Sequence, residues 1–351
     1  MSHSPQAVKG QGAQSKVHNP YLEHRYVREE YDGLDVPDSE ITEPTIYQEV
    51  YPKSILNKID SPDIPYRWGL NPYQGCEHGC IYCYARHTHN YWGYDAGVDF
   101  ERKIMVKKTA PTLLRAKLRS RNWEGEPVML SGNTDCYQPV ERELGITRQL
   151  LEVFLEERHP VGMITKNDLI LRDLDILKEL ASRQLVTVAV SITTLDERLR
   201  RALEPRTSTG LRRLNAVKQL SEAGIPVTVM MAPVIPGLNS TEIPEIIQRS
   251  AEAGASGFHH LVVRLNHQNG TLFEVWAQRH YPDRANKLLN QIKKLHGGSL
   301  SDSRSKIRMR GEGAEADAIS ALARIHRTLH FKDRKPAYQL SPKKPDQLSL
   351  F

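Results

Sequence analysis

The stretch NPYQGCEHGCIYCYAR, residues 71–86, contains three of the four cysteines in a chain of 351 residues. Cys76, Cys80 and Cys83 follow a short apolar run, in a loop that also contains two glycines. Four cysteines are too few for a disulfide scaffold in a chain of this length, and their grouping indicates a metal or redox site.

Three thiolates can each bind one iron of a [4Fe–4S] cluster and leave the fourth iron without a protein ligand. Such an open coordination position is what a catalytic centre needs. The alternative is a single zinc ion, with His78, His87 or His89 as the fourth ligand. Zinc fingers usually separate their cysteines into pairs, whereas here all three are crowded together, so the spacing favours the cluster.

Composition restricts the setting of the protein. No segment approaches the roughly 18 consecutive apolar residues of a membrane span, and the first 16 residues lack an apolar signal core. We therefore expect a soluble, cytoplasmic protein without a membrane partner. The net charge of the whole chain is +6. Residues 279–335 alone carry +8, so the rest of the chain carries about −2. This basic region suits a phosphate backbone, and it suits an ordinary solvated face equally well.

Short apolar runs rich in β-branched residues alternate with helix-like segments from about residue 66 onward. The runs cover residues 66–70, 127–131, 161–165, 186–192, 226–232 and 258–263. The alternation predicts parallel strands with crossover helices. Six such units predict an α/β fold, a partial (β/α)6 barrel with its chemistry at the carboxyl ends of the strands. Periodicity alone leaves an open, doubly wound sheet possible.

The chain divides into four expected parts. Residues 1–60 are polar and predict a largely disordered lead-in. The partial barrel is expected over residues 61–270, a basic region of helices and strands over 271–340, and a flexible tail over 341–351.

The cysteine motif resembles the signature of the radical S-adenosylmethionine (SAM) enzymes. Further segments, among them SGNTDCYQPVERELGITRQLLEV and SITTLDERLRRALEPRT, resemble the branch related to spore photoproduct lyase, often described as DNA repair photolyase-like. The resemblance extends from about Ser61 to Gly313. It implies a [4Fe–4S] cluster on Cys76, Cys80 and Cys83, bound SAM, and reductive cleavage of SAM to a 5′-deoxyadenosyl radical. It also implies an electron donor such as a flavodoxin or ferredoxin.

A DNA lesion is the substrate that this branch implies, so the expected activity is lyase-like DNA repair. Two alternatives stay open. One is radical modification of tRNA, a protein or a small metabolite. The other is a cluster protein without turnover that binds nucleic acid or senses redox state.

The resemblance also implies which residues bind SAM. They lie in the cysteine loop and at the strand ends, and they are Tyr82 near the adenine; Ser131, Gly132, Asn133 and Thr134 near the methionine amino group; Lys166 and Arg206 near the carboxylate; and Ser191 and Thr193 near the ribose hydroxyls or the carboxylate. Lysine offers a point charge, and arginine can bind a carboxylate with two parallel hydrogen bonds.

Cys136 lies just beyond the second predicted barrel strand. Spore photoproduct lyase uses a cysteine near this strand end to return a hydrogen atom to the substrate radical, which makes Cys136 a catalytic candidate. The thiol is a few residues further along here, and a small buried apolar side chain is the alternative role. Tyr137 and Tyr84 are the other redox-active candidates.

Two features near the C-terminus suggest partners. Arg304, Lys306, Arg308 and Arg310 alternate, which would place them on one face of an extended strand, either along a phosphate backbone or as protection of a sheet edge.

The last five residues resemble the peptide by which bacterial polymerases and repair proteins dock on the sliding clamp. They are Gln347, Leu348, Ser349, Leu350 and Phe351. The preceding SPKKPD is expected to be an extended, flexible tether. A tail that folds back on its own domain is the alternative.

Overall fold

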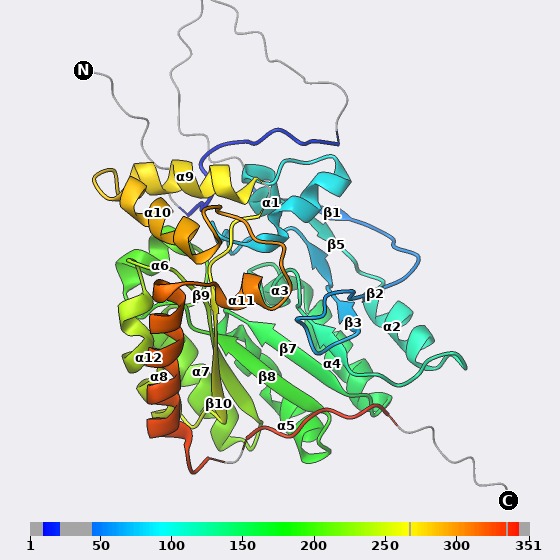
Figure 1. Cartoon of the computed structure of the whole chain (residues 1–351). Helices are drawn as coiled ribbons and strands as arrows, with labels where there is room; N and C mark the ends of the chain where they lie inside the picture. Colours follow the sequence, from blue (N-terminus) through cyan, green and yellow to red (C-terminus); the bar gives the residue numbers. More distant parts are fainter. Residues whose placement is uncertain (1–9, 22–43, 267, 335, 344–351) are drawn as a thin grey trace, which may run out of the picture.

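The computed structural model describes residues 10–21, 44–266, 268–334 and 336–343. In these residues the main sheet has seven strands, in the order β10-β9-β8-β7-β6-β3-β2 (Figure 1). Neighbouring strands are parallel except β2 and β3, which pair antiparallel at one edge. The strands are Leu56–Lys58 (β2), Trp68–Leu70 (β3), Val128–Leu130 (β6), Val161–Thr165 (β7), Val186–Ser191 (β8), Val227–Val234 (β9) and Gly257–Val262 (β10).

Helices connect the parallel strands and cover one side of the sheet (Figure 1). The covering helices are Ala110–Leu118 (α2), Ile146–Glu156 (α4), Leu174–Ser182 (α5), Gly210–Glu222 (α7), Ile243–Glu252 (α8) and Ala314–Phe331 (α12). The shorter or more peripheral ones are Val98–Arg102 (α1), Glu141–Leu144 (α3), Glu197–Leu203 (α6), Asn269–His280 (α9), Ala285–Leu295 (α10) and Ile307–Arg310 (α11). Three segments are 3₁₀ helices: Tyr84–Trp92 (η1), Asp168–Asp173 (η2) and Ser240–Glu242 (η3).

This architecture confirms the predicted fold class. Each of the six apolar runs overlaps a strand of the parallel series, and the strand order makes an open, partial barrel in the described part of the chain. The helix α7 begins just after a threonine, because the side chain of Thr209 accepts a hydrogen bond from the backbone N–H of Arg212.

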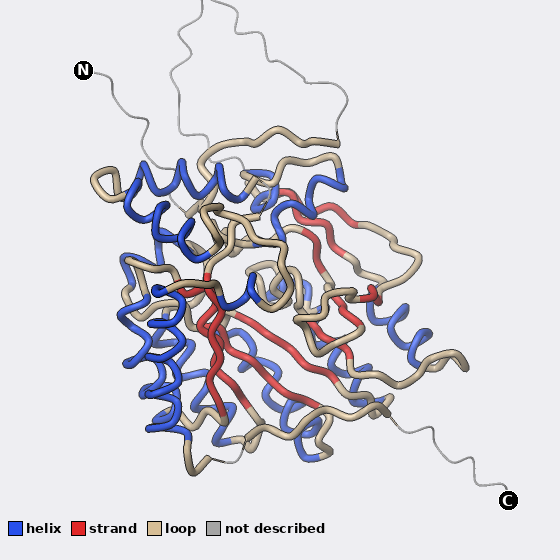
Figure 2. Tube along the Cα trace, in the orientation of Figure 1, coloured by secondary structure: helices blue, strands red, loops and turns tan. Residues whose placement is uncertain are grey.

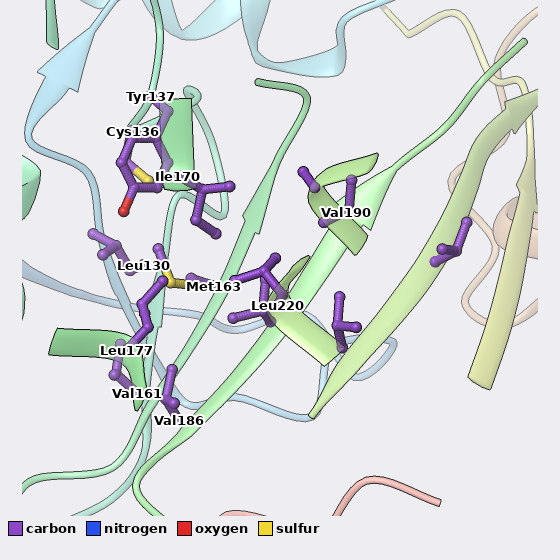
Figure 3. Close-up of a cluster of buried hydrophobic side chains, with 14 of the residues drawn as sticks. Leu130, Cys136, Tyr137, Val161, Met163, Ile170, Leu177, Val186, Val190 and Leu220 are labelled. Carbon is purple, nitrogen blue, oxygen red and sulfur yellow. The ribbon is translucent and has the colours of Figure 1, made fainter. Parts of the chain in front are cut away.

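The main hydrophobic core lies between the sheet and the covering helices. On β8, Val186, Val188 and Val190 are buried in this core, while Thr187 and Ala189 between them are partly exposed. Period-two alternation places successive side chains on opposite faces of a strand. Leu177 of α5 and Leu220 of α7 lie in the same cluster (Figure 3).

The described parts of the expected lead-in are ordered. Residues Ile46–Glu49 form β1, which pairs parallel with β5 (Lys103–Val106), and β5 pairs antiparallel with β4 (Tyr73–Gln74). Within residues 10–21, Gly12, Ala13 and Asn19 are buried. Residues 10–21 contact the barrel through the hydrogen bonds described below.

The alternating basic segment is not a strand. Ile307–Arg310 is the short helix α11, so a period-two face is absent there. Arg304 forms ion pairs with Asp302 and Glu312, and Arg308 pairs with Asp63. The prediction of four cations on one extended face was therefore wrong.

The C-terminal segment 336–343 crosses the opposite end of the sheet, along the amino ends of the strands (Figure 1, red). The hydroxyl of Tyr338 donates to the carbonyl of Val186, the first residue of β8. The amide of Lys343 donates to the carbonyl of Gly125, just before β6, at 2.7 Å. The predicted clamp-docking peptide, residues 347–351, lies outside the described residues. None of the helices in the described part of the chain combines the length and apolar character that crossing a membrane requires.

Candidate active site

The cysteine loop connects β4 with η1 at the carboxyl end of the sheet, where Figure 2 shows loops and short helices above the strands. Gly75 and Gly79 in this loop have φ angles of +83° and +66°. Residues with a Cβ rarely adopt this left-handed conformation, so glycine lets the chain turn back twice within a few residues. The amide of Cys76 donates to the carbonyl of Phe100 at 2.9 Å, which fixes the start of the loop.

The three thiols of the loop lie together. Cys76 and Cys80 are buried, and Cys83 is partly exposed. Burial raises the pKa of the Cys76 thiol well above its usual value, and nearby Asp135, Cys80 and Cys83 raise it further. Burial is also the main cause that raises the pKa of Cys80 and of Cys83. Neutral thiols are thus favoured until cations such as iron compensate for the charge of the thiolates.

Backbone amides lie close to two of the sulfur atoms. The amide of Asp135 acts to lower the pKa of the Cys76 thiol, and the amide of Ala85 acts to lower that of Cys83, against the larger effect of burial. Hydrogen bonds to cysteine sulfur are among the factors that set the reduction potential of iron–sulfur clusters.

The turn after β6 contains the first group of predicted SAM-binding residues. Ser131 adopts a φ of +72°, an uncommon conformation for a residue with a side chain. Its hydroxyl donates to the carbonyl of Thr134 and accepts from the amide of Cys136, which holds the turn. The carbonyl of Gly132 accepts a hydrogen bond from Tyr84, and the amide of Asn133 donates to the side chain of Asn71.

The ends of β7 and β8 add a cation and a buried hydroxyl. Lys166 is partly buried; burial lowers the pKa of its amine, but nearby Cys80, Glu204 and Asp135 more than offset this, so the net pKa is raised. Lys166 therefore stays charged beside the cysteine loop. The hydroxyl of Ser191 is buried and has no hydrogen-bond partner among the described residues. A buried unpaired polar atom is costly, so this hydroxyl is suited to a bound ligand.

A buried network holds Tyr82, which lies between the second and third cysteines. Its hydroxyl donates to the carboxylate of Glu204, which also accepts from Thr193 at 2.6 Å and from Arg213 at 2.5 Å. Burial alone would raise the pKa of Glu204, but Arg213, Lys166 and these hydroxyls lower it to about 2. The network brings the cysteine loop, the end of β8 and α7 together.

Glu204 and Arg213 were not predicted as site residues. Both side chains are fully inaccessible to solvent. Glu204 lies in the quoted LEPR segment, two residues before Arg206, and that motif was the only available signal. The predicted residue Arg206 is partly buried, and its guanidinium lies beside Gly10 and near Tyr47.

His78, between the first and second cysteines, is also buried. Its Nδ1 atom lies 3.3 Å from the carboxylate of Asp135, and its Nε2 lies 3.3 Å from Asn167. Burial would raise the pKa of Asp135, but His78 and the amides of Lys166 and Tyr137 lower it to about 2. This pair ties the cysteine loop to the ends of β6 and β7.

The other proposed zinc ligands have different surroundings. His87 contacts the carbonyl of Tyr84, and the ring of His89 packs edge-on against Phe100. Within the described residues, no group of three or more His, Cys, Asp or Glu side chains is arranged to hold a single metal ion.

Cys136 and Tyr137, the two catalytic candidates, lie in the main hydrophobic core (Figure 3). Both side chains are fully buried, and Tyr137 donates a hydrogen bond to Asp173 at 3.0 Å. Burial raises the pKa of the Cys136 thiol well above its usual value. These surroundings favour the alternative in which Cys136 is a small buried apolar side chain.

A family model described as the Radical SAM superfamily matches residues 70–249, about half of the chain. The chain belongs to the radical SAM superfamily. This match includes the cysteine loop and the strand ends described above, and it makes the protein an enzyme. The match ends within α8, so β10 and the C-terminal helices lie beyond it.

Relatives of this radical SAM enzyme occur in bacteria and archaea. An uncharacterized protein of Mycobacterium tuberculosis is 34% identical over 240 residues, which cover 68% of this chain and 71% of that protein. An uncharacterized protein of Methanocaldococcus jannaschii is 30% identical over 190 residues, covering 54% and 68% of the two chains.

Solved structures of spore photoproduct lyase share the fold. The enzyme complexed with dinucleoside spore photoproduct has a TM-score of 0.60 at 17% identity, and the match covers 83% of this chain and 82% of that one. A double mutant of the same lyase, with bound AdoMet and the dinucleoside, has a TM-score of 0.59 at 16% identity, covering 84% and 82%.

The residues of this radical SAM enzyme fit the cofactors of the superfamily. Three thiols lie together in one loop, and backbone amides lie close to two of them. A cluster takes one thiolate per iron, so its three sulfur ligands do not have to converge on one ion. The unpaired hydroxyl of Ser191 and the charged Lys166 lie at the neighbouring strand ends.

Proposed function

We propose that Cys76, Cys80 and Cys83 hold a [4Fe–4S] cluster, and that the strand ends beside it bind SAM. The cluster would supply the electron that cleaves SAM to a 5′-deoxyadenosyl radical. The observation that carries this proposal is the group of three thiols, two of them buried, in one glycine-turned loop at the carboxyl end of the partial barrel.

In this proposal the chain binds and orients SAM. Lys166 offers a charged partner for the methionine carboxylate, and Ser191 offers a hydroxyl that no described residue satisfies. The bond from Tyr82 to Glu204 holds the tyrosine ring in one orientation beside the cysteines, where an adenine can pack. Ser131 to Thr134 present the turn after β6 to the methionine amino group.

We propose a DNA lesion as the substrate. The structural neighbours bind a dinucleoside photoproduct, residues 279–335 carry an excess of eight positive charges, and the last five residues resemble a clamp-docking peptide. The cytoplasmic location, the division of the chain near residue 270 and a flavodoxin or ferredoxin as electron donor remain predictions of the same proposal.

The test is anaerobic reconstitution, followed by incubation with dithionite, SAM and oligonucleotides that are either undamaged or ultraviolet-irradiated. Mass spectrometry should detect 5′-deoxyadenosine and a repaired or altered base. Replacing Cys76, Cys80 or Cys83 by alanine should abolish the brown absorbance and 5′-deoxyadenosine. One tightly bound zinc ion and no reconstitutable iron would refute the radical mechanism. Products from tRNA but from no DNA would reject the DNA substrate alone.

We also propose that Gln347, Leu348, Ser349, Leu350 and Phe351 dock on the sliding clamp. These residues lie outside the described part of the chain, so the argument is chemical. Three apolar side chains can fill an apolar pocket, and an amide can orient them by hydrogen bonds. A peptide of residues 341–351 should bind purified clamp, and a peptide with alanine at Leu350 and Phe351 should not. No association at high micromolar clamp would reject docking.

A further inference from the structure

Arg86, three residues after the third cysteine, has a fully buried guanidinium beside the cysteine loop. It donates to the carbonyl groups of Gly79 and Cys80 at 3.2 and 3.0 Å, and to those of Ala96 and Gly97 on the other side. Arginine can make such contacts because its planar fork has five donors. Arg86 therefore fixes the middle of the cysteine loop to the segment before α1.

Glu101 of α1 completes this buried group. Its carboxylate is 1% exposed and accepts from Arg86 at 2.5 Å. It also accepts from the backbone amides of Gly12 and Ala13, at 3.0 and 2.7 Å. A buried carboxylate is thus shared between the cysteine loop, through Arg86, and the N-terminal segment.

Residues 10–21, which we term the strap, continue over the same end of the molecule (Figure 1, dark blue). Gln14 contacts Arg279 of α9, and the carbonyl of His18 accepts from Gln268. Asn19 is buried and donates to the carbonyls of Asn90 and Tyr94. The strap is therefore fastened at both ends, with Glu101 near one end and η1 near the other.

The strap lies directly against the cysteine loop. A Cβ atom placed on Gly12 would overlap the carbonyl oxygen of Gly79. Ala13 is fully buried and packs in the same apolar cluster as Cys80 and Tyr82. Only glycine at position 12 permits this contact, and the strap covers the loop on the side of Cys80.

We infer that Glu101 and Arg86 are positioning residues, which latch the strap onto the cysteine loop so that the strap shields Cys80 from solvent and holds the loop in its cluster-binding shape. The inference deepens the proposed function and rests on it only where the cluster is concerned. Shielding of the thiol itself is a property of the apoprotein.

The test introduces one side chain at two places in the strap. Gly12→Val must displace the strap from Gly79, whereas Lys16→Val is the control, because Lys16 is exposed. The rate of alkylation of each cysteine in the native apoprotein is measured with iodoacetamide and mass spectrometry. Cys136 is the internal reference, since it is fully buried in the main hydrophobic core, away from the strap.

In Gly12→Val, Cys80 should react on the order of tenfold faster, because the variant loses hydrogen bonds to a charged carboxylate that keep the strap closed. Lys16→Val should match the wild type, and Cys136 should stay unreactive. Equal Cys80 rates in folded Gly12→Val and Lys16→Val would overturn the inference. If Cys136 also reacts with iodoacetamide in Gly12→Val, this variant has unfolded. The variant Asn19→Ala then tests the inference in its place. This variant loosens the other end of the strap, and an unchanged Cys80 rate in it would also overturn the inference.

A second readout uses the reconstituted protein. Reduction adds negative charge to a cluster, and water stabilises that charge, so an opened strap should shift the midpoint potential to more positive values. Air should also bleach the variant faster than Lys16→Val. Loss of fold alone would not move the potential of the intact cluster. A wild-type protein that binds no iron would refute the proposed function. The alkylation rates would still test whether the strap shields Cys80.

Discussion

Buried arginine side chains hold the irregular loops around the candidate site in place. Arg86, Arg200 and Arg213 are each at most 6% exposed, and each donates to backbone carbonyls of loops at the strand ends. These loops have carbonyl groups that accept no hydrogen bond from a neighbouring strand. A guanidinium satisfies several of them at once, in a fixed geometry that a lysine ammonium cannot copy.

Arg213→Lys should therefore be strongly destabilising. Arg213 donates to the carbonyls of Ser208 and Ser191 and to the carboxylate of Glu204. Lysine would leave part of this set unpaired, at a cost of about 2–4 kcal/mol in the free energy of unfolding. Arg212→Lys is the matched control, since Arg212 is 64% exposed, and it should cost less than about 0.5 kcal/mol. Urea unfolding of the two variants measures both values, and equal costs would contradict the role of the buried network.

Cys136→Ala should separate packing from hydrogen transfer. The thiol lies in the main core, so its removal should lower the free energy of unfolding by about 1 kcal/mol through the small cavity that it leaves. Cluster content and 5′-deoxyadenosine formation should stay at the wild-type level, unlike in Cys76→Ala. If Cys136→Ala unfolds like the wild type but loses only the product of the substrate radical, the thiol is the hydrogen donor.

The sequence points to one part of this candidate site, the cysteine loop. The spacing of Cys76, Cys80 and Cys83 identifies the loop, because metal chemistry restricts which residues can be neighbours along the chain. Arg86 and Glu101 left no such signal. Charged residues are rarely buried unless they are paired. Glu101 is paired with backbone amides of the strap, which is distant in the sequence, and Arg86 with carbonyls of neighbouring loops whose shape no sequence pattern indicates.

At the scale of elements, the parallel strands were predictable because their apolar runs fill one core. The segment after Asp302 was not, because its shape depends on distant partners. The carboxylate of Asp63 accepts from the amide of Lys306 and from the guanidinium of Arg308. These contacts stabilise a turn and a short helix, although the alternating charges alone fit a strand.

The connection between α4 and β7 should make stability depend on pH. His159 is fully buried, accepts from the indole N–H of Trp123 at Nε2, and places Nδ1 at 3.1 Å from the carbonyl of Pro160. Both contacts are satisfied by a neutral ring. Burial, with a smaller contribution from Lys343, lowers the pKa of His159 from 6.5 to about 4.

A histidine whose pKa is lower in the folded state takes up its proton more readily when unfolded. Its contribution to stability is complete above pH 6.5 and declines as pH falls from 6.5 towards 4, by on the order of 2 kcal/mol. His159→Gln keeps an acceptor for Trp123 and cannot be protonated. Urea unfolding at pH 7.5 and 5 should show a smaller difference between the two pH values in the variant. An identical difference would show that His159 does not titrate on unfolding.

The whole molecule has two ends that differ in construction. The cysteine loop, the strap and the buried arginines gather at the carboxyl ends of the strands, whereas residues 336–343 cross the amino ends. Tyr338→Phe removes the hydrogen bond to Val186 and should lower the free energy of unfolding by about 1 kcal/mol. Because these two regions lie at opposite ends of the strands (Figure 1), the alkylation rate of Cys80 in the native protein should not change. A faster rate would mean that the two ends are coupled.

The path of residues 336–343 gives the molecule a defined point for attachment to a surface. The amide of Lys343 is bonded to the carbonyl of Gly125 just before β6, so whatever is attached beyond Lys343 starts from the end of the molecule opposite the cysteine loop. A protein immobilised on an electrode or bead through its C-terminal side would present the loop to the solution. Soluble reductants and oligonucleotides would then approach this end from the solution, so turnover assays on beads should use this orientation, whereas direct electron transfer from an electrode needs the opposite one.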